Sequence, residues 1–269
     1  MATIIGTSEY DYLSGTDRKD SIIGLAGNDI LDGDKGADIM DGGMGNDIYR
    51  VDHNRDVIIE GVDAGTDVVL SVTNNYTLSP NVENLELLGS ANSGGGNALD
   101  NYISGNNSNN YLWGGAGNDT IFGGDTNFGA VTNDSDTMLG GDGNDFLIGG
   151  IGSDVLTGGA GADYFYISSD SNGIDRIIDF NRAEGDKFAI SGPVFGGNIT
   201  TETGAANGPL LSSQFVTGVG ATNSDHRFIY NSSNGALFFD SDGTGASAQV
   251  QIASFSTGLA LISSDIQVI

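Results

Sequence analysis

The chain contains no cysteine, and this absence excludes disulfide bonds, thiol catalysis and zinc–thiolate sites. Basic residues are also scarce: 9 lysines and arginines stand against 36 aspartates and glutamates, so the formal net charge is −27. A nucleic-acid interface needs clustered basic residues, and an anionic membrane surface would repel a chain of this charge. We therefore expect neither nucleic acid nor a membrane surface as a partner.

Long hydrophobic runs are missing too. No apolar stretch approaches the ~18 residues that a membrane-spanning helix needs. The segment Met1 to Ser14 lacks both the basic and the apolar part of an ordinary signal peptide, so none is expected. The His-Glu-x-x-His motif of zinc proteases and the Gly-x-Ser-x-Gly motif of lipases are absent, and no other catalytic constellation stands out. We therefore expect no enzymatic activity.

Glycine is abundant, with 44 residues, and twelve of these glycines recur at nine-residue intervals in two blocks. Each nonapeptide is numbered here from its glycine. An eight-residue insertion after Gly123 is the only break within a block. The glycines at position one are Gly6, Gly15, Gly24, Gly33 and Gly42 in the first block, and Gly96, Gly105, Gly114, Gly123, Gly140, Gly149 and Gly158 in the second.

Two further columns keep the same phase, which chance does not produce. Position eight is large and apolar in all twelve repeats, being Leu13, Ile22, Leu31, Met40, Tyr49, Ile103, Leu112, Ile121, Met138, Leu147, Leu156 and Phe165. Position six is asparagine in two repeats, at Asn101 and Asn110. It is aspartate in the other ten, namely Asp11, Asp20, Asp29, Asp38, Asp47, Asp119, Asp136, Asp145, Asp154 and Asp163.

A glycine turn followed by a short extended segment explains these columns. Glycine lets the backbone adopt φ > 0 and turn tightly. In the extended segment position eight points inward, while positions seven and nine face outward. One inward residue per strand cannot be buried alone, but stacked strands bury a continuous ladder. The pattern predicts an all-β fold, a parallel β-roll or β-helix solenoid.

The aspartates would oppose this stacking. Successive turns lie on alternate edges of the roll, so aspartates eighteen residues apart come together. Two carboxylates ~5 Å apart repel by roughly 3 kcal/mol at an effective dielectric constant near 20. A stack of them needs a counter-ion, and ligands that are all oxygen favour calcium over zinc or copper. The ten position-six aspartates are therefore the candidate metal ligands.

Four segments, 27–32, 42–49, 114–122 and 140–148, resemble the RTX, or hemolysin-type, calcium-binding nonapeptide repeat. The resemblance covers residues 6–50 and 96–166. It implies several calcium ions between turns on the same edge, each held by position-six aspartates and backbone carbonyls. The pairs that it implies are Asp11/Asp29, Asp29/Asp47, Asp20/Asp38, Asp119/Asp145, Asp145/Asp163 and Asp136/Asp154.

Some turns depart from the family pattern. Glycine at position four is replaced by Glu9 and Arg18 in the first two turns, which makes these turns weaker candidates. The turns at Asn101 and Asn110 lack both this glycine and the aspartate, and we expect them to stack without a metal. The loop Thr126–Asn133 interrupts one turn of the second block.

We expect four segments along the chain. Residues 1–50 and 96–166 form the two β-roll blocks, and residues 51–95 form a β-rich spacer without the glycine turns. Residues 167–269 contain strand-like runs with a hairpin loop at Asn231–Gly235. They resemble the C-terminal cap and uncleaved type I secretion region that follow such repeats, and the ending Ser264–Ile269 is similar to the usual close of that region.

Three smaller features have competing interpretations. His53 and His226 are expected at the surface rather than as metal ligands. The segment Asp240–Gly243 resembles part of an EF-hand loop, but its glycine stands at the fourth place rather than the sixth, which favours a turn at a strand end. The alternation places Tyr111, Trp113 and Phe122 on the outer face, where they pack against neighbouring segments or form a carbohydrate platform.

Together these features predict a secreted calcium-binding protein, extracellular or attached to the cell surface. We expect calcium binding to drive its folding after type I export. The expected partners are calcium ions and the type I secretion machinery, with a polysaccharide or the cell surface as a further candidate. Two alternatives stay open: an extracellular surface, matrix or carbohydrate-binding module, and a non-catalytic C-terminal portion of a larger secreted enzyme.

Overall fold

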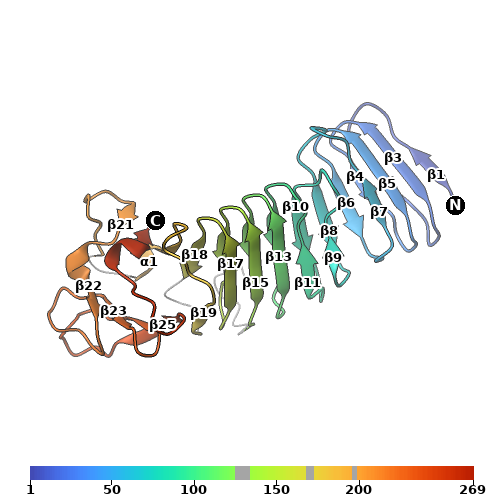
Figure 1. Cartoon of the computed structure of the whole chain (residues 1–269). Coiled ribbons are helices and arrows are strands. Elements are labelled where there is room, and N and C mark those ends of the chain that lie inside the picture. Colours follow the sequence, from blue (N-terminus) through green and yellow to red (C-terminus); the bar gives the residue numbers. More distant parts are fainter. Residues whose placement is uncertain (125–133, 168–172, 196–198) are drawn as a thin grey trace. The chain divides into compact units, whose positions relative to one another are not determined.

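The computed structural model describes residues 1–124, 134–167, 173–195 and 199–269, so the expected loop Thr126–Asn133 lies outside the described residues. The described chain consists of short β-strands with one α-helical turn and two 3-10 turns (Figure 1). It divides into two compact units, Met1–Gly124 and Asp125–Ile269. The expected all-β fold is confirmed. Among the described residues, no helix is long and apolar enough to cross a membrane.

The first unit is a roll of parallel strands. Residues eighteen apart are partners in most of its coils; for example, Ile4 pairs with Ile22 and Leu13 with Leu31. Strands on one side form the sheets β1-β3-β5-β7 and β9-β11-β13, and strands on the other form β2-β4-β6-β8-β10-β12-β14. The strands are β1 (Thr3–Ile5), β2 (Tyr12–Ser14), β3 (Ser21–Ala26), β4 (Ile30–Asp32), β5 (Ile39–Met44), β6 (Ile48–Val51), β7 (Val57–Ile59), β8 (Val68–Ser71), β9 (Tyr76–Thr77), β10 (Asn84–Leu87), β11 (Ser93–Gly95), β12 (Tyr102–Ser104), β13 (Tyr111–Ala116) and β14 (Thr120–Phe122).

The spacer takes part in this roll although it lacks the glycine turns. Strands β8 and β10 lie between β6 and β12 in one sheet. Tyr49 pairs with Val69, which is 69 − 49 = 20 residues later, and Val69 pairs with Leu85, which is 85 − 69 = 16 residues later. A long coil is thus followed by a short one, and together they span 36 residues, two regular coils. The nonapeptide phase of the second block is restored for this reason.

Position eight builds the core of the roll, as the pattern predicts. Leu13 in the first complete coil is 9% exposed, and the other eleven residues of this column are fully buried. Within each unit these residues stack on partners one coil away, as Leu31 does on Leu13 and Leu156 on Met138, and so form a continuous buried ladder. The fold is a parallel β-roll solenoid.

The second unit repeats this roll and closes it with further strands. Parallel pairs join β16, β18, β20 and β26 in one sheet, and β15, β17, β19 and β25 in the other. The elements are β15 (Thr137–Asp142), β16 (Phe146–Ile148), β17 (Val155–Ala160), β18 (Tyr164–Ile167), β19 (Asp175–Ile177), β20 (Lys187–Ile190), α1 (Gly192–Phe195), β21 (Gly208–Pro209), η1 (Ser212–Gln214), β22 (Phe215–Thr217), β23 (Phe228–Asn231), β24 (Ala236–Phe239), β25 (Val250–Ser254), η2 (Ser263–Asp265) and β26 (Ile266–Val268).

The end of the chain forms the β-rich cap that the sequence predicts. Strands β23, β24 and β25 are antiparallel, and the expected hairpin loop at Asn231–Gly235 connects the first two. An ion pair ties the cap to the roll: the Arg182 guanidinium donates to both carboxylate oxygens of Asp265, which is 1% exposed. The last strand, β26, is therefore both paired to β20 and anchored by a buried carboxylate.

Candidate metal centre

The turns of the roll bring the predicted aspartates together in pairs one coil apart. The backbone N–H of Asp11 donates to Oδ1 of Asp29 at 2.8 Å, and that of Asp29 donates to Oδ1 of Asp47 at 2.7 Å. The same contact joins Asp20 with Asp38, Asp136 with Asp154, and Asp145 with Asp163. Five of the six implied pairs are thus in hydrogen-bonded contact. The sixth, Asp119 with Asp145, has one member in each unit.

Glycine at position one lets the carboxylate of the same turn and a carbonyl of the next coil approach the backbone closely. A Cβ atom built on Gly24 would lie 2.5 Å from Oδ2 of Asp29 and 2.5 Å from the carbonyl oxygen of Gly42. Position four needs glycine in this turn as well, because Gly27 adopts φ +118°. The turn therefore packs oxygen atoms from two coils against Gly24, and any side chain at Gly24 would clash with them.

In four of these aspartates the second carboxylate oxygen is buried without a donor among the described residues. Among the described residues, the Oδ2 atoms of Asp29, Asp38, Asp47 and Asp163 are buried and accept no hydrogen bond. A buried, unpaired carboxylate oxygen is costly, by at least about 1–3 kcal/mol in a protein interior. The ion pairs in the described part of the chain are Lys35–Asp17, Arg50–Asp32 and Arg182–Asp265, so none of them neutralises the ladder.

The pKa values of these aspartates reflect the cost of burying their charged form. Burial raises the pKa values of Asp29, Asp38 and Asp47 above that of an exposed aspartate. Burial also raises the pKa of Asp163 to about 7, and the neighbouring carboxylate of Asp186 adds to the shift. A raised carboxyl pKa means that the fold disfavours the ionised form. At neutral pH the ladder therefore opposes folding until a cation compensates its charge.

In two other turns, a threonine of the same turn donates hydrogen bonds to the Oδ2 atom of the aspartate. The N–H and hydroxyl of Thr7 donate to Oδ2 of Asp11 at 2.6 and 2.9 Å. Thr16 makes the same contacts with Asp20 at 2.8 and 2.6 Å, and these hydrogen bonds lower the pKa of Asp20. Because the threonine replaces a cation as the partner of the carboxylate, these turns can close without a metal. The residue at position two thus distinguishes the two kinds of turn.

The asparagine turns close in a related way. The N–H of Asn97 donates to Oδ1 of Asn101 at 2.7 Å, and the N–H of Asn106 donates to Oδ1 of Asn110 at 2.8 Å. The amide group of Asn101 also donates to the carbonyl of Glu83, one coil earlier. A neutral side chain with both donors and an acceptor can therefore link two coils by hydrogen bonds alone.

The ladder also contains carboxylates that the nonapeptide pattern does not identify. Asp56 accepts from the N–H of Asp38, and Asp67 from that of Asp47. In the second unit Asp175 and Asp186 accept from Asp154 and Asp163. None of the four follows a position-one glycine at the regular spacing. Their shared signal is a large apolar residue two positions later, namely Ile58, Val69, Ile177 and Phe188, all buried.

This donor set fits calcium. It offers carboxylate and main-chain carbonyl oxygens only, which two successive coils bring close together. Calcium accepts six to eight oxygen ligands in flexible geometry, whereas magnesium demands a compact octahedron. Asp29, Asp38, Asp47 and Asp163 could hold such an ion with the neighbouring carbonyls, and the ion would supply the positive charge that the ladder lacks.

A methyl group in the space beside a carboxylate should destabilise the roll. A Cβ atom on Gly158 would lie 2.7 Å from Cγ of Asp163, so Gly158→Ala should cost about 1–3 kcal/mol of unfolding free energy. The control is Gly220→Ala in the same unit, where the nearest atom would be 3.9 Å away. Urea unfolding in saturating calcium compares the two. Equal stabilities would mean that the turn is looser than the structure describes.

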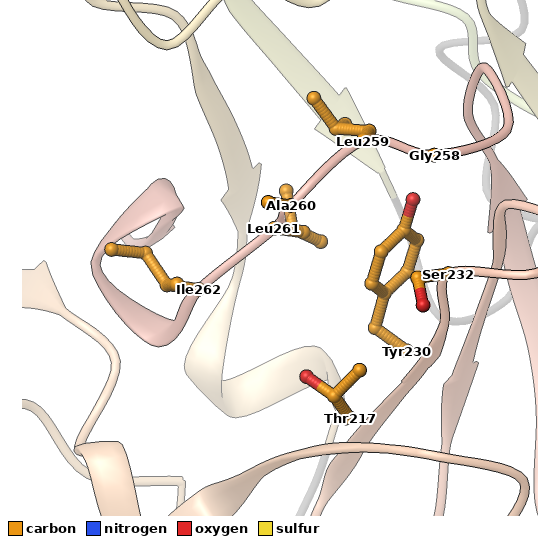
Figure 2. Close-up of a pocket in the computed structure, with 8 residues that line it drawn as sticks. All are labelled: Thr217, Tyr230, Ser232, Gly258, Leu259, Ala260, Leu261 and Ile262. Atoms are coloured by element: carbon orange, nitrogen blue, oxygen red, sulfur yellow. The ribbon is translucent and has the colours of Figure 1, made fainter.

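The remaining candidates do not form a second centre. His226 is 8% exposed, so the expected surface position is wrong for it; its Nδ1 accepts from the N–H of Thr222 within a loop. Asp240 accepts from the N–H groups of Asp242 and Gly243, which makes the EF-hand-like segment a turn. A pocket in the second unit is lined by Thr217, Tyr230, Ser232 and residues 258–262 (Figure 2), and none of these side chains is a carboxylate or a base.

Comparisons with known proteins agree with the geometry of the turns. Residues 14–49, 95–127 and 131–165 match the model of the RTX calcium-binding nonapeptide repeat (4 copies). Comparison with curated proteins gives no match. The crystal structure of extracellular lipase LipA from Serratia marcescens matches with 20% identity and a TM-score of 0.26, over 99% of this chain and 40% of the lipase chain. The chain thus spans less than half of that lipase chain, and a TM-score this low supports no conclusion. Over these segments the chain contains RTX calcium-binding nonapeptide repeats.

Proposed function

We propose that this chain is a secreted protein, extracellular or bound to the cell surface, in which calcium binding drives folding after type I export. We propose no catalytic role for it. The observation that carries this proposal is the ladder of buried carboxylates, in which the Oδ2 atoms of Asp29, Asp38 and Asp163 accept no hydrogen bond from any described residue. Calcium between the turns would turn their mutual repulsion into attraction, so the ion and the fold depend on each other.

The proposed ligands are the position-six aspartates of the open turns, together with main-chain carbonyls of the next coil. They are Asp29, Asp38, Asp47, Asp119, Asp136, Asp145, Asp154 and Asp163. We assign Asp11 and Asp20 to turns that close through Thr7 and Thr16 instead, because their Oδ2 atoms already have two donors each.

Exchanging a single carboxylate for an amide tests this division. Asp29→Asn keeps the oxygen that bonds the N–H of Asp11 but removes the charge. We expect it to weaken calcium binding about tenfold, because affinity of such sites follows the charge of the ligands. Asp20→Asn makes the same exchange in a buried turn that Thr16 closes, and its calcium affinity should stay unchanged. Isothermal titration of both full-length variants decides between them; equal losses would contradict the assignment.

Export is the second part of the proposal, and the resemblance of residues 167–269 to type I secretion regions supports it. Calcium is scarce inside the cell, so the acidic turns would stay open there and the chain would remain loose enough for transport. Deleting residues 210–269 should abolish export by a co-expressed type I exporter, as measured by the amount of chain in the medium. If the truncated chain is exported as well as the intact one, the C-terminal segment is a structural cap only.

Carbohydrate binding is a second candidate function. Tyr111 is 47% exposed, and its ring centroid lies 5.9 Å from that of Trp113 on the outer face of β13. Neighbouring exposed rings of this kind can stack on sugars. The pair also has a packing role, because the Trp113 ring occupies the space beside Gly95. A glycan array probed in calcium, with Tyr111→Ala as the control, separates the two roles.

A further inference from the structure

The coil from Asp47 to Asp67 places a third buried carboxylate beside the two that a regular turn brings together. Asp47 and Asp67 stand at the starts of the paired strands β6 and β8, and the N–H of Asp47 donates to Oδ1 of Asp67 at 2.8 Å. The coil is two residues longer than the regular eighteen. The extra length lies in the turn after β7, where a third carboxylate, that of Glu60, enters the same site.

Glu60 occupies a place where regular turns have glycine. Strands β5 and β7 pair Asp41 with Ile59, so the next residues in register are Gly42 and Glu60. In regular coils a side chain at this place would clash with the aspartate carboxylate, as the contacts of Gly24 demonstrate. Here the longer turn accommodates a glutamate, whose carboxylate lies beside those of Asp47 and Asp67.

The three carboxylates are buried and lie close to one another. Asp47, Glu60 and Asp67 each contribute an oxygen to a group within 4.8 Å of one another. Asp47 and Asp67 are fully buried and Glu60 is 9% exposed. The Oδ2 atoms of Asp47 and Asp67 accept no hydrogen bond from any described residue. Two fully buried, unpartnered oxygens therefore face the third carboxylate.

Tyr49 fixes the position of Glu60. Its hydroxyl accepts from the N–H of Gly42 at 2.8 Å and donates to Oε1 of Glu60. The N–H of Gly61 donates to Oε2 at 3.2 Å. Since Tyr49 is fully buried in the core ladder, the glutamate is held by a rigid partner and not by solvent.

Nothing in the described part of the chain neutralises this set through an ion pair. Burial raises the pKa of Glu60 to about 7 and that of Asp67 to about 6, with smaller contributions from the neighbouring carboxylates. Ionised carboxylates that are buried this close together repel one another. The folded site therefore needs either shared protons or a bound cation. Three oxygen ligands of full charge around one space are the donor set that calcium prefers.

We propose that Asp47, Glu60 and Asp67 form a calcium site of higher affinity than the regular turns of the first unit, outside the nonapeptide pattern. The proposal rests on calcium binding by the roll and deepens it, because it names the site that fills first. A regular open turn offers one carboxylate from each of two coils, whereas this turn offers a third on a fixed side chain. Affinity of calcium sites rises with ligand charge and rigidity.

The matched variants are Glu60→Gln and Asp63→Asn in the full-length chain. Asp63 lies in the same turn but is exposed, so its exchange removes the same charge without touching the site. In competition titrations with a chelator, Glu60→Gln should bind one calcium ion fewer, or bind its tightest ion about tenfold or more weakly. Asp63→Asn should match the unaltered protein. Unchanged tight binding in Glu60→Gln would overturn the site and indicate a shared proton, which glutamine imitates.

Terbium soaked into crystals of the unaltered protein tests the site without a variant. We expect an anomalous peak within ligand distance of Asp47, Glu60 and Asp67 at the lowest terbium concentration that gives any peak. If peaks appear at the regular turns but none appears at Asp47, Glu60 and Asp67, the three-carboxylate site is overturned while calcium binding by the regular turns stands. If Asp163→Asn also leaves calcium binding unchanged and no peak is present anywhere, the proposed function itself fails.

Discussion

Excess EGTA is expected to abolish the β-sheet signal of this protein in far-UV circular dichroism and to expand the chain in small-angle X-ray scattering. The reason is the ladder of buried carboxylates in a chain of net charge −27. One site at a hundredfold excess of calcium over its dissociation constant contributes about 2.7 kcal/mol to stability. Four such sites contribute about 11 kcal/mol, which is comparable to the whole stability of an ordinary domain of 5–15 kcal/mol.

The control for the EGTA experiment compares the addition of calcium with the addition of magnesium. Restored calcium should recover both the spectrum and the compact radius, whereas magnesium at the same concentration should recover little, because it does not tolerate the irregular oxygen geometry of the turns. An unchanged spectrum and radius in excess EGTA would show that the roll is stable without ions. In that case the acidic ladder would have to be held by protons and hydrogen bonds.

Removal of residues 263–269 is expected to destabilise the second unit in saturating calcium. This deletion takes away β26, whose Ile266 and Val268 are buried against β20, and it removes Asp265, the partner of Arg182. Loss of the burial of two aliphatic side chains, and of an ion pair whose carboxylate is buried and whose guanidinium is 40% exposed, should together cost about 5 kcal/mol. The thermal midpoint should fall by about 10 °C or more.

The control for this deletion is Gln267→Ala in the full-length chain, since Gln267 lies between the two buried residues of β26 and is itself partly exposed. Differential scanning calorimetry in calcium compares the three proteins. A deletion variant with the thermal midpoint of the intact chain would mean that β20 tolerates an open edge. The ladder of β16, β18 and β20 would then be self-sufficient.

Much of the fold was predictable because its periodicity is short. Every nonapeptide uses local turn chemistry and one inward residue at position eight, so the phase of Gly24, Asp29 and Leu31 specifies both the turn and the face of the strand. The buried ladder at position eight and the eighteen-residue pairing follow from that phase. The spacer was harder, because its coils of 20 and 16 residues break the period locally and restore it only as a pair.

The candidate site was predictable only in part. Position six identifies the carboxylates of the regular turns, but it does not separate Asp11 from Asp29. The two aspartates differ in the structure in whether a donor reaches Oδ2. The difference is a threonine at position two, whose hydroxyl reaches Asp11, where the turn of Asp29 has Leu25. Which oxygen has a donor depends on side-chain directions in three dimensions, which a spacing rule does not contain.

The sequence by itself predicted the solenoid and calcium as its counter-ion, because both follow from residue columns that repeat every nine positions. The tertiary structure alone decided which carboxylates share a space. Glu60 lies thirteen residues from Asp47 and belongs to no repeat column, yet it reaches the same site because β5 and β7 pair in register and Tyr49 holds it there. Contacts between coils are set by strand stacking and turn length together, so they emerge only when the chain is folded.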